Sequence, residues 1–462
     1  MAGLSDRSPG LDPGVRDAAG SASNEAEFDA ARGVIPGGVN SPVRAYASVG
    51  GTPRFVASAS GARVTDVAGR DYVDLVGSWG PALLGHAHPE VVAAVQAAAA
   101  RGLSFGAPTH GETELAALVL ARLAEHARPV AERVRLVSTG TEATMTAIRL
   151  ARAATGRDLV VKFAGHYHGH SDGLLAEAGS GLATQALPAS SGVPAAIAAQ
   201  TIVLPYNDLA ALGAAFDAHP GRIAAVITEA AGANAGVLAP EPGFNAALAR
   251  LAGAEGALVV LDEVLTGFRV GPAGWWGLET AAGAAWEPDL LTFGKVIGGG
   301  MPLAALAGRA SLMELLAPLG PVYQAGTLSG NPLAVAAGLA TLRLADAEVY
   351  RRIDAAAGVV ADAVEETFAT VGQPVTVSRA GSLFSLAFRS GAVRDYDDAR
   401  DQESWRYAPF FASMLADGVS LPPSVFEAWF LSAAHGEEDV ARVLDALPRA
   451  ARAAAAARPA DG

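Results

Sequence analysis

The alternation of short apolar runs with helical segments between residues 112 and 293 constrains the fold of this chain most. We expect helices at 112–127, 142–154 and 243–254 and strands at 134–137, 159–163, 223–228, 257–261 and 290–293. Strands that alternate with helices in this way build a mostly parallel sheet with helices on both faces. The sequence therefore predicts an α/β fold.

The pattern changes on either side of this region. Residues 54–76 alternate apolar and polar side chains between Gly and Asp turns, which predicts a small antiparallel meander. Beyond about residue 345, long alanine-rich helices and a few strands predict a smaller α+β domain. We therefore predict a disordered arm over 1–25, a segment with the meander over 26–90, a large domain over 91–345 and a small domain over 346–462.

Lys295 follows the apolar run 290–293 and precedes a run of three glycines at 298–300. A single lysine at a strand end is usually a solvated surface residue. Here the apolar and glycine neighbours leave nothing long to shield it from a ligand. Burial lowers the pKa of a lysine from about 10.4 and leaves a nucleophilic amine, which imine-forming enzymes require.

Asp262 follows the apolar run 256–261, at the carboxyl end of a predicted strand. Open α/β sheets bind ligands at that edge, although a single Asp there more often caps a helix or pairs with a cation. With Lys295 one βα unit later, a specific chemistry becomes attractive. The carboxylate would keep a pyridinium nitrogen protonated while the lysine forms a Schiff base. The pair predicts pyridoxal 5′-phosphate (PLP) as the cofactor.

Two segments rich in small residues precede predicted helices, at 138–143 and at 326–332. Backbone N–H groups at a helix start bind phosphate, which makes both segments candidate phosphate sites. The alternative for the first segment is an ordinary helix cap at Thr139 or Thr141. Beside Lys295 and Asp262, we favour the phosphate interpretation.

The segment 163–170 holds three histidines and one tyrosine after a strand. Glycines between them and the absence of carboxylates disfavour a metal site, whereas an aromatic ring here can stack on a planar cofactor. Residues 171–194 are rich in Gly, Ala and Ser and predict a loop that can serve as a lid. Glu229 and Asn234 follow another strand at the same sheet edge as Asp262.

Charge and composition exclude several classes of protein. A net charge of −14 disfavours nucleic acid and anionic membranes as partners. The chain has no cysteine, which excludes disulfides, zinc–thiolate sites and thiol nucleophiles. The first residues lack the apolar core of a signal peptide, and no apolar run is long enough to span a bilayer. We expect a cytoplasmic enzyme that acts on a small molecule.

Nine stretches between residue 33 and about residue 435 carry a family resemblance: GGVNSPVRA, SWGP, SFGAPT, TGTEATMTAIRLAR, FAGHYHGHSD, LDEVLTGFRVG, PDLLTFGKVIGGGMP, YQAGTLSGNPLA and PPSVFEAWFLSAAH. The sequence resembles the class-III aminotransferases, which are PLP enzymes of fold type I. GGVNSPVR, YHGH and AGTLSGNP are closest to the aminomutases of this family. The resemblance implies a large domain around a mostly parallel, seven-stranded type of sheet and a smaller α+β C-terminal domain.

The resemblance also implies roles for residues around the cofactor. Lys295 would be the Schiff-base lysine and proton shuttle, and Asp262 would pair with the pyridinium nitrogen. The other implied contacts are Tyr167 on the ring, Asn234 near its 3-hydroxyl, Gly140 and Thr141 on the phosphate, and Thr327 from the other subunit of a homodimer.

On the substrate side, the resemblance implies that Ser41 and Arg44 receive a carboxylate, for which a guanidinium fork suits better than a lysine. Trp79 would line the pocket and Glu427 would lie close to the substrate amines. Ser180 would belong to the gating loop.

The implied reaction isomerises (S)-4-amino-5-oxopentanoate to 5-aminolevulinate, the tetrapyrrole precursor. The cofactor would start as pyridoxamine 5′-phosphate (PMP), form PLP and diaminovalerate, and return to PMP. Hand-over of the semialdehyde from the reductase that makes it also follows from the resemblance. Departures from the family pattern at Ala164, His166 and around Gly232 leave room for a shifted substrate.

Two alternatives stay open at this point. A class-III aminotransferase or epimerase with a different amino substrate would share Lys295, Asp262 and the phosphate segment. A PLP-fold protein that binds without catalysis is the alternative of another class, and the presence of both Lys295 and Asp262 disfavours it.

Overall fold

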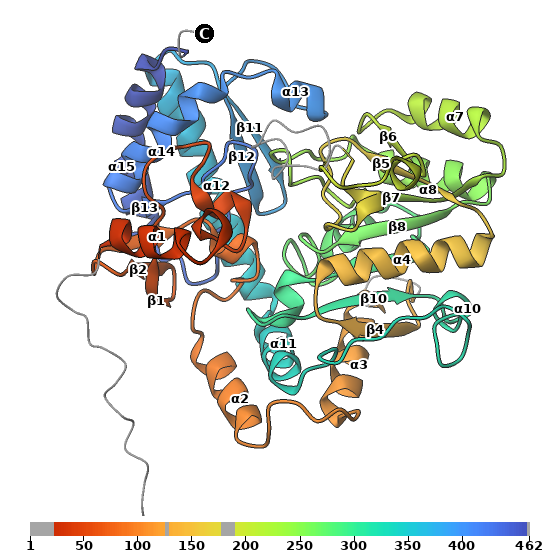
Figure 1. Cartoon of the computed structure of the whole chain (residues 1–462). Coiled ribbons are helices and arrows are strands. Elements are labelled where there is room, and N and C mark those ends of the chain that lie inside the picture. Colours follow the sequence, from red (N-terminus) through yellow and green to blue (C-terminus); the bar gives the residue numbers. More distant parts are fainter. Residues whose placement is uncertain (1–22, 125–128, 177–189, 460–462) are drawn as a thin grey trace, which may run out of the picture.

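The computed structural model describes residues 23–124, 129–176 and 190–459, and its largest sheet has seven strands. The order is β4-β10-β9-β8-β7-β5-β6, and only β10 runs antiparallel to its neighbours. The expected mostly parallel sheet is therefore confirmed (Figure 1). The strands are β4 (Arg133–Val137), β5 (Leu159–Phe163), β6 (Thr201–Leu204), β7 (Ile223–Glu229), β8 (Leu258–Glu263), β9 (Leu290–Phe293) and β10 (Ala304–Gly308).

Apolar side chains cover this sheet on both faces. Every residue of β5, β7, β9 and β10 is buried. Successive side chains of a strand point to opposite faces, so Val260 packs in one core with Ile148 and its neighbour Leu261 packs in another with Leu248. This is why the strands read as continuous apolar runs and not as alternating ones.

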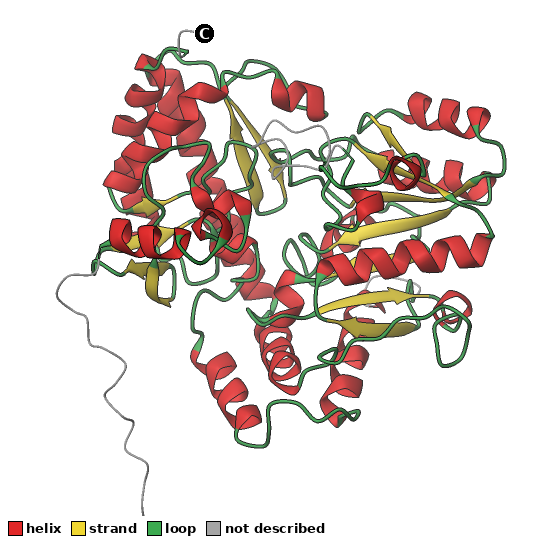
Figure 2. Ribbon diagram, in the orientation of Figure 1, coloured by secondary structure: helices red, strands yellow, loops and turns green. Residues whose placement is uncertain are grey.

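Helices lie on both faces of the sheet (Figure 2). Within the described residues, the expected boundaries of these helices and strands agree with the observed ones to within two residues, a difference that is usual at the ends of elements. Residues 125–127, the expected end of the helix over 112–127, lie outside the described residues. The helices of this part are α2 (Pro89–Ala99), α3 (His110–Ala124), α4 (Gly140–Thr155), α6 (Ala195–Ala198), α7 (Leu209–Ala218), α8 (Phe244–Ala254), α9 (Gly274–Ala281), α10 (Ala310–Met313) and α11 (Pro332–Leu344).

The start of α4 illustrates how local sequence sets an element. Thr139 is the N-cap, and its hydroxyl accepts a hydrogen bond from the Glu142 N–H at 3.2 Å. The Glu142 carboxylate in turn accepts from the Ser138 N–H at 2.7 Å. The helix therefore begins at Gly140, two residues before the expected start, because the cap at Thr139 places the next two small residues inside the helix.

The first and last parts of the chain pack together and form the second body of the molecule, next to the part built on the seven-stranded sheet. The expected meander is present as β1, β2 and β3, and β13 adds to β3 in parallel. Tyr72 and Leu75 share one core with Phe368, Phe410 and Trp429. The predicted segments 26–90 and 346–462 thus meet in one core.

The strands of this second body are β1 (Val56–Ser60), β2 (Arg63–Asp66), β3 (Asp71–Asp74), β11 (Thr376–Ala380), β12 (Leu383–Ala387) and β13 (Val419–Ser420). Its helices are α1 (Asn24–Arg32), α12 (Ala347–Thr370), α13 (Tyr396–Arg400), α14 (Tyr407–Ala416) and α15 (Glu437–Ala456). In the described part of the chain, none of the helices has the length and apolar character needed to cross a membrane.

Candidate active site

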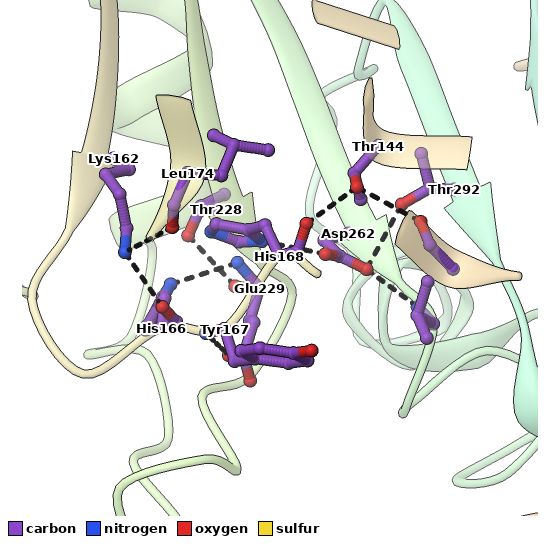
Figure 3. Close-up of polar contacts among 12 residues, drawn as sticks. Thr144, Lys162, His166, Tyr167, His168, Leu174, Thr228, Glu229, Asp262 and Thr292 are labelled. Atoms are coloured by element: carbon purple, nitrogen blue, oxygen red, sulfur yellow. Dashed lines mark hydrogen bonds and ion pairs between the residues drawn. The ribbon is translucent and has the colours of Figure 1, made fainter. Parts of the chain in front are cut away.

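Three polar residues form one row across the carboxyl ends of neighbouring strands. Asp262 in β8 is paired in register with Glu229 in β7 and with Thr292 in β9. Residues that pair directly across a parallel sheet point to the same face, so their side chains gather on one side of the sheet edge (Figure 3). This edge is where open α/β sheets bind ligands.

The Asp262 carboxylate is buried and held by three hydrogen bonds. Its Oδ1 accepts from the Val264 N–H at 2.9 Å and from the Thr292 hydroxyl at 3.1 Å. Its Oδ2 lies 2.7 Å from Nδ1 of His168, which is itself fully enclosed (Figure 3). Burial lowers the pKa of His168, and the bond to Asp262 opposes this shift. The imidazole and the two other donors therefore fix the orientation of the carboxylate.

Glu229 is the second buried carboxylate of the row. Its Oε1 accepts from the Tyr167 N–H at 2.7 Å and from the Asn234 amide at 2.9 Å, and its Oε2 accepts from the Ala233 N–H at 2.8 Å. Burial raises the pKa of Glu229 to about 7, while the N–H donors work in the opposite direction. Glu229 thus ties together two expected cofactor residues, Tyr167 and Asn234.

A buried lysine holds the backbone of the segment that carries Tyr167 and His168. Lys162 in β5 donates to the carbonyl oxygens of His166 at 3.0 Å and Leu174 at 3.4 Å (Figure 3). It also donates to the carbonyl oxygen of Ala176 at 2.6 Å. Among the described residues, no group of three or more His, Asp or Glu side chains is arranged to hold a metal. Nδ1 of His166 accepts a hydrogen bond from the Glu229 N–H at 3.0 Å, and the rings of His166 and His168 lie edge to face, so these two histidines serve packing and hydrogen bonding.

Lys295 follows β9 after a single residue, Gly294, and has a backbone φ of +50°, a left-handed conformation that is strained for a residue with a side chain. Burial lowers the pKa of Lys295, whereas Asp262, Glu229 and Glu427 raise it. The expected direction of the pKa shift is confirmed. A strained backbone at a reactive lysine is a common property of functional sites.

Two glycines allow the chain to pack closely around the start of α4. A side chain in place of Gly140 would lie 3.0 Å from Val264, and one in place of Gly169 would lie 2.5 Å from the Thr141 hydroxyl. The first N–H groups of a helix have no partners within it, and they carry the positive end of the helix dipole. Such a helix start is a binding site for an anion.

One cavity of about 390 Å³ unites these features. It is large enough for a small cofactor. Its lining brings together the start of α4, the Asp262 carboxylate, the Lys295 amine and the Tyr167 ring, a set of groups that fits PLP. Six of the seven predicted cofactor residues line it: Gly140, Thr141, Tyr167, Asn234, Asp262 and Lys295.

The remaining predicted site residues lie elsewhere in the single chain. Thr327 is exposed and lines a different cavity, next to residues 104–109. Arg44 and Trp79 line a cavity of about 480 Å³ beside the meander, and Ser41 is the N-cap of the short helix over 42–45. Glu427 is buried and acts on the pKa of Lys295. Ser180 lies outside the described residues.

The site contains residues that sequence reasoning did not assign. His168 and Thr292, which hold Asp262, are the main ones. The position of Thr292 in the sequence could have indicated its role, because Thr292 is the polar residue of the strand that ends just before Lys295. The partner of His168 was not readable, since 94 residues separate it from Asp262.

Comparisons with known proteins agree with this geometry. The aminotransferase class-III family matches residues 46–435. A glutamate-1-semialdehyde 2,1-aminomutase from Cutibacterium acnes is 61% identical over 434 residues, which cover 94% of this chain and 98% of that protein. The protein of the same name from Tropheryma whipplei is 57% identical over 454 residues, 94% of this chain and 97% of that protein.

Solved structures with the same fold are also similar. An omega-transaminase from Sphaerobacter thermophilus has a TM-score of 0.84 at 29% identity and covers 94% of this chain and 98% of that one. A glutamate-1-semialdehyde aminomutase from Pseudomonas aeruginosa has a TM-score of 0.81 at 28% identity and covers 93% of this chain and 94% of that one. A variant of that enzyme was solved in complex with PMP.

Proposed function

This chain belongs to the class-III aminotransferase family, and from this premise we propose that it is a glutamate-1-semialdehyde 2,1-aminomutase. The reaction isomerises (S)-4-amino-5-oxopentanoate to 5-aminolevulinate for tetrapyrrole synthesis. The observation that carries the proposal is that Lys295 and Asp262 open onto one cavity beside the start of α4. The similarity of 57% to 61% to aminomutases from two bacteria selects this reaction within the family.

The cofactor is PLP, which alternates with PMP and supplies an acceptor and donor of the amino group. Asp262 would hold its ring nitrogen, in a position that His168 and Thr292 fix. Tyr167 would face the ring and Asn234 its 3-hydroxyl. Gly140 and Thr141 would bind the phosphate through the N–H groups of the helix start.

Lys295 would accept and return the proton at its Nζ as the amino group changes position. The lowered pKa of Lys295 supports this role, because burial makes the neutral amine, the form that accepts a proton, easier to reach. Nearby Asp262, Glu229 and Glu427 limit the shift and keep the protonated form accessible.

The substrate would enter from the side of the meander. Arg44 and Ser41 would bind its carboxylate and Trp79 would line its path. Arg44 and Trp79 line the cavity of about 480 Å³ beside the meander, which supports their part of this assignment. Glu427, buried and close enough to affect Lys295, would face the substrate amines.

We further propose that the enzyme works as a homodimer in which Thr327 of one protomer reaches the phosphate site of the other. Large apolar side chains are exposed around it, with Leu328 at 56%, Phe105 at 50% and Tyr323 at 73%. Clustered exposed apolar residues commonly mark a protein interface. A cytoplasmic location and receipt of the semialdehyde from the reductase that makes it are parts of the same proposal.

The decisive experiment supplies no second substrate. The purified protein is loaded with PMP, glutamate-1-semialdehyde is added without any amino acid or keto acid, and 5-aminolevulinate is followed. Many turnovers per site are expected, because the amino group stays within the pair of cofactor and substrate. Product that stops at one equivalent, or that needs an added amino donor, would point to an aminotransferase with another substrate.

A further inference from the structure

A turn with an unusual backbone lies between β3 and α2, next to the side chain of Lys295. Gly77, Ser78, Trp79 and Gly80 have φ values of +53°, +55°, +66° and +116° in succession. Two of these residues carry side chains, for which a left-handed φ is unfavourable. Such a backbone persists only where the surrounding structure holds it in place.

One side of this turn is held by Asp74 at the end of β3. Its carboxylate accepts from the Val76 N–H at 2.9 Å and from the Gly77 N–H at 3.2 Å. His86 contacts the same carboxylate at 2.7 Å. These contacts fix the first half of the turn.

The other half is held by Arg269, which comes from the turn after β8. Its Nη1 donates to the Gly80 carbonyl at 3.0 Å, and its Nη2 donates to the Leu431 carbonyl. The side chain is fully buried, and its guanidinium lies 5.3 Å from the centre of the Phe430 ring. Burial lowers the pKa of Arg269 to about 10, so the group stays charged at neutral pH.

Lys295 lies against the same residue of the turn. A side chain built on Gly80 would come within 3.2 Å of Cδ and 3.9 Å of Cε of Lys295, and within 3.5 Å of Phe430. The methylene groups of the lysine therefore rest on the bare backbone of Gly80. Arg269 binds the carbonyl of this residue, so the support of Lys295 depends on a buried cation from another part of the chain.

We propose that Arg269 is a positioning residue for Lys295. By binding the Gly80 carbonyl, it keeps the left-handed turn in the conformation that supports the lysine. The same conformation places Trp79 at the cavity beside the meander. A buried cation among main-chain carbonyls is costly to keep, which a purely apolar wall would avoid. The inference rests on the proposed function only in that Lys295 must react with the aldehyde of PLP.

The test measures the lysine without any substrate. Nζ of Lys295 adds to the aldehyde carbon of PLP and the aldehyde oxygen leaves as water; absorbance of the cofactor follows this reaction in cofactor-free protein. Arg269→Lys keeps the charge but cannot reach both carbonyls with a planar fork. It should slow the reaction about 10-fold, since small displacements of a reacting group have effects of this size or larger.

Two comparisons separate positioning from general damage. PMP has no aldehyde and does not react with Lys295, so its dissociation constant, measured by calorimetry, should change less than about 2-fold, which is below 0.5 kcal/mol. Arg406→Lys is the matched control, because Arg406 is also buried and donates to main-chain carbonyls, at 2.9 Å for Ala454, but lines none of the cavities above. This control should react with PLP at the wild-type rate.

A second variant changes Gly80, the residue whose carbonyl Arg269 binds and against which Lys295 packs. Gly80→Ala leaves Arg269 in place but sets a methyl group against Lys295, and it should also slow the reaction with PLP. Equal rates for Arg269→Lys and Arg406→Lys would overturn the proposal, as would a parallel loss of PMP affinity in Arg269→Lys. Because no semialdehyde is used, the result holds or fails independently of whether the chain proves to be an aminomutase.

Discussion

The two ends of the candidate active site differ in how completely a single chain builds them. At the Asp262 end, the side chains are buried and each oxygen of the carboxylate has a partner from the same chain. At the other end, Arg44 and Thr327 are exposed and line separate cavities. The fold of one chain therefore prepares the cofactor ring site, whereas in the dimer that we propose Thr327 of the second protomer completes the phosphate site.

The largest expected loss of activity comes from a substitution at the cofactor ring site, where Asp262 and Lys295 lie. Lys295→Ala should lower kcat on the order of 10⁴-fold, because it removes the group that would form the covalent bond and move the proton. PMP should still bind, since Asp262 and the start of α4 are untouched. Turnover and PMP affinity measured on the same preparation check both statements. Wild-type turnover in this variant would rule out the assignment of Lys295.

The next effect tests the charge at the same end. Asp262→Asn should lower kcat about 10³-fold, because a neutral amide cannot hold a protonated pyridinium nitrogen. Asp289→Asn is the matched control. Asp289 directly precedes β9 and its carboxylate also accepts a hydrogen bond from a main-chain N–H, that of Val259 at 2.8 Å, but Asp289 does not line the cofactor cavity. The control should lose stability and keep its activity. Similar losses of activity in both variants would contradict the role of Asp262.

A third prediction concerns pH and Glu229. Burial raises its pKa to about 7 in the folded protein, against about 4.3 in an unfolded chain. Between these values the folded protein binds more protons, so the free energy of unfolding falls as pH rises through this window. Glu229→Gln removes this dependence. Between about pH 4 and about pH 8, the free energy of unfolding of the wild type should fall by up to about 3 kcal/mol relative to that of the variant.

Denaturant unfolding of the cofactor-free protein at several pH values measures this difference. Glu263 is the comparison, because burial also raises its pKa to about 7, yet it does not line the cofactor cavity. Glu263→Gln should alter the pH dependence of stability in the same direction without changing PLP affinity. A wild-type stability that rises with pH over this window relative to Glu229→Gln would contradict the assignment.

The smallest effect belongs to the exposed end. Thr327→Ala should weaken PLP binding about 10-fold, the value of one hydrogen bond to a charged group. Mixing this variant with Lys295→Ala should restore wild-type affinity and activity at one site of each mixed dimer, because that site receives Lys295 from one protomer and Thr327 from the other. Absence of recovery after subunit exchange would mean that each protomer builds its phosphate site alone.

Much of the site followed from local patterns. The strand ends before Asp262 and Lys295, the helix after Thr139 and the row of glycines after Lys295 are each encoded within a few residues, and the structure brings Lys295 and Asp262 to one cavity as expected. The substrate-side assignments of Ser41, Arg44, Trp79, Glu427 and Ser180 remain predictions. They depend on the family resemblance.

The sequence by itself determined the α/β class, the parallel sheet and the reactive pair, because hydrophobic periodicity and turn residues act over short distances. Only the tertiary structure decided which residues support that pair. His168 meets Asp262 across 94 residues and Arg269 meets Gly80 across 189. The meander likewise packs with the far end of the chain in one core. Contacts of this kind arise when buried polar groups must find partners in the folded chain, and no local pattern specifies which partner that will be.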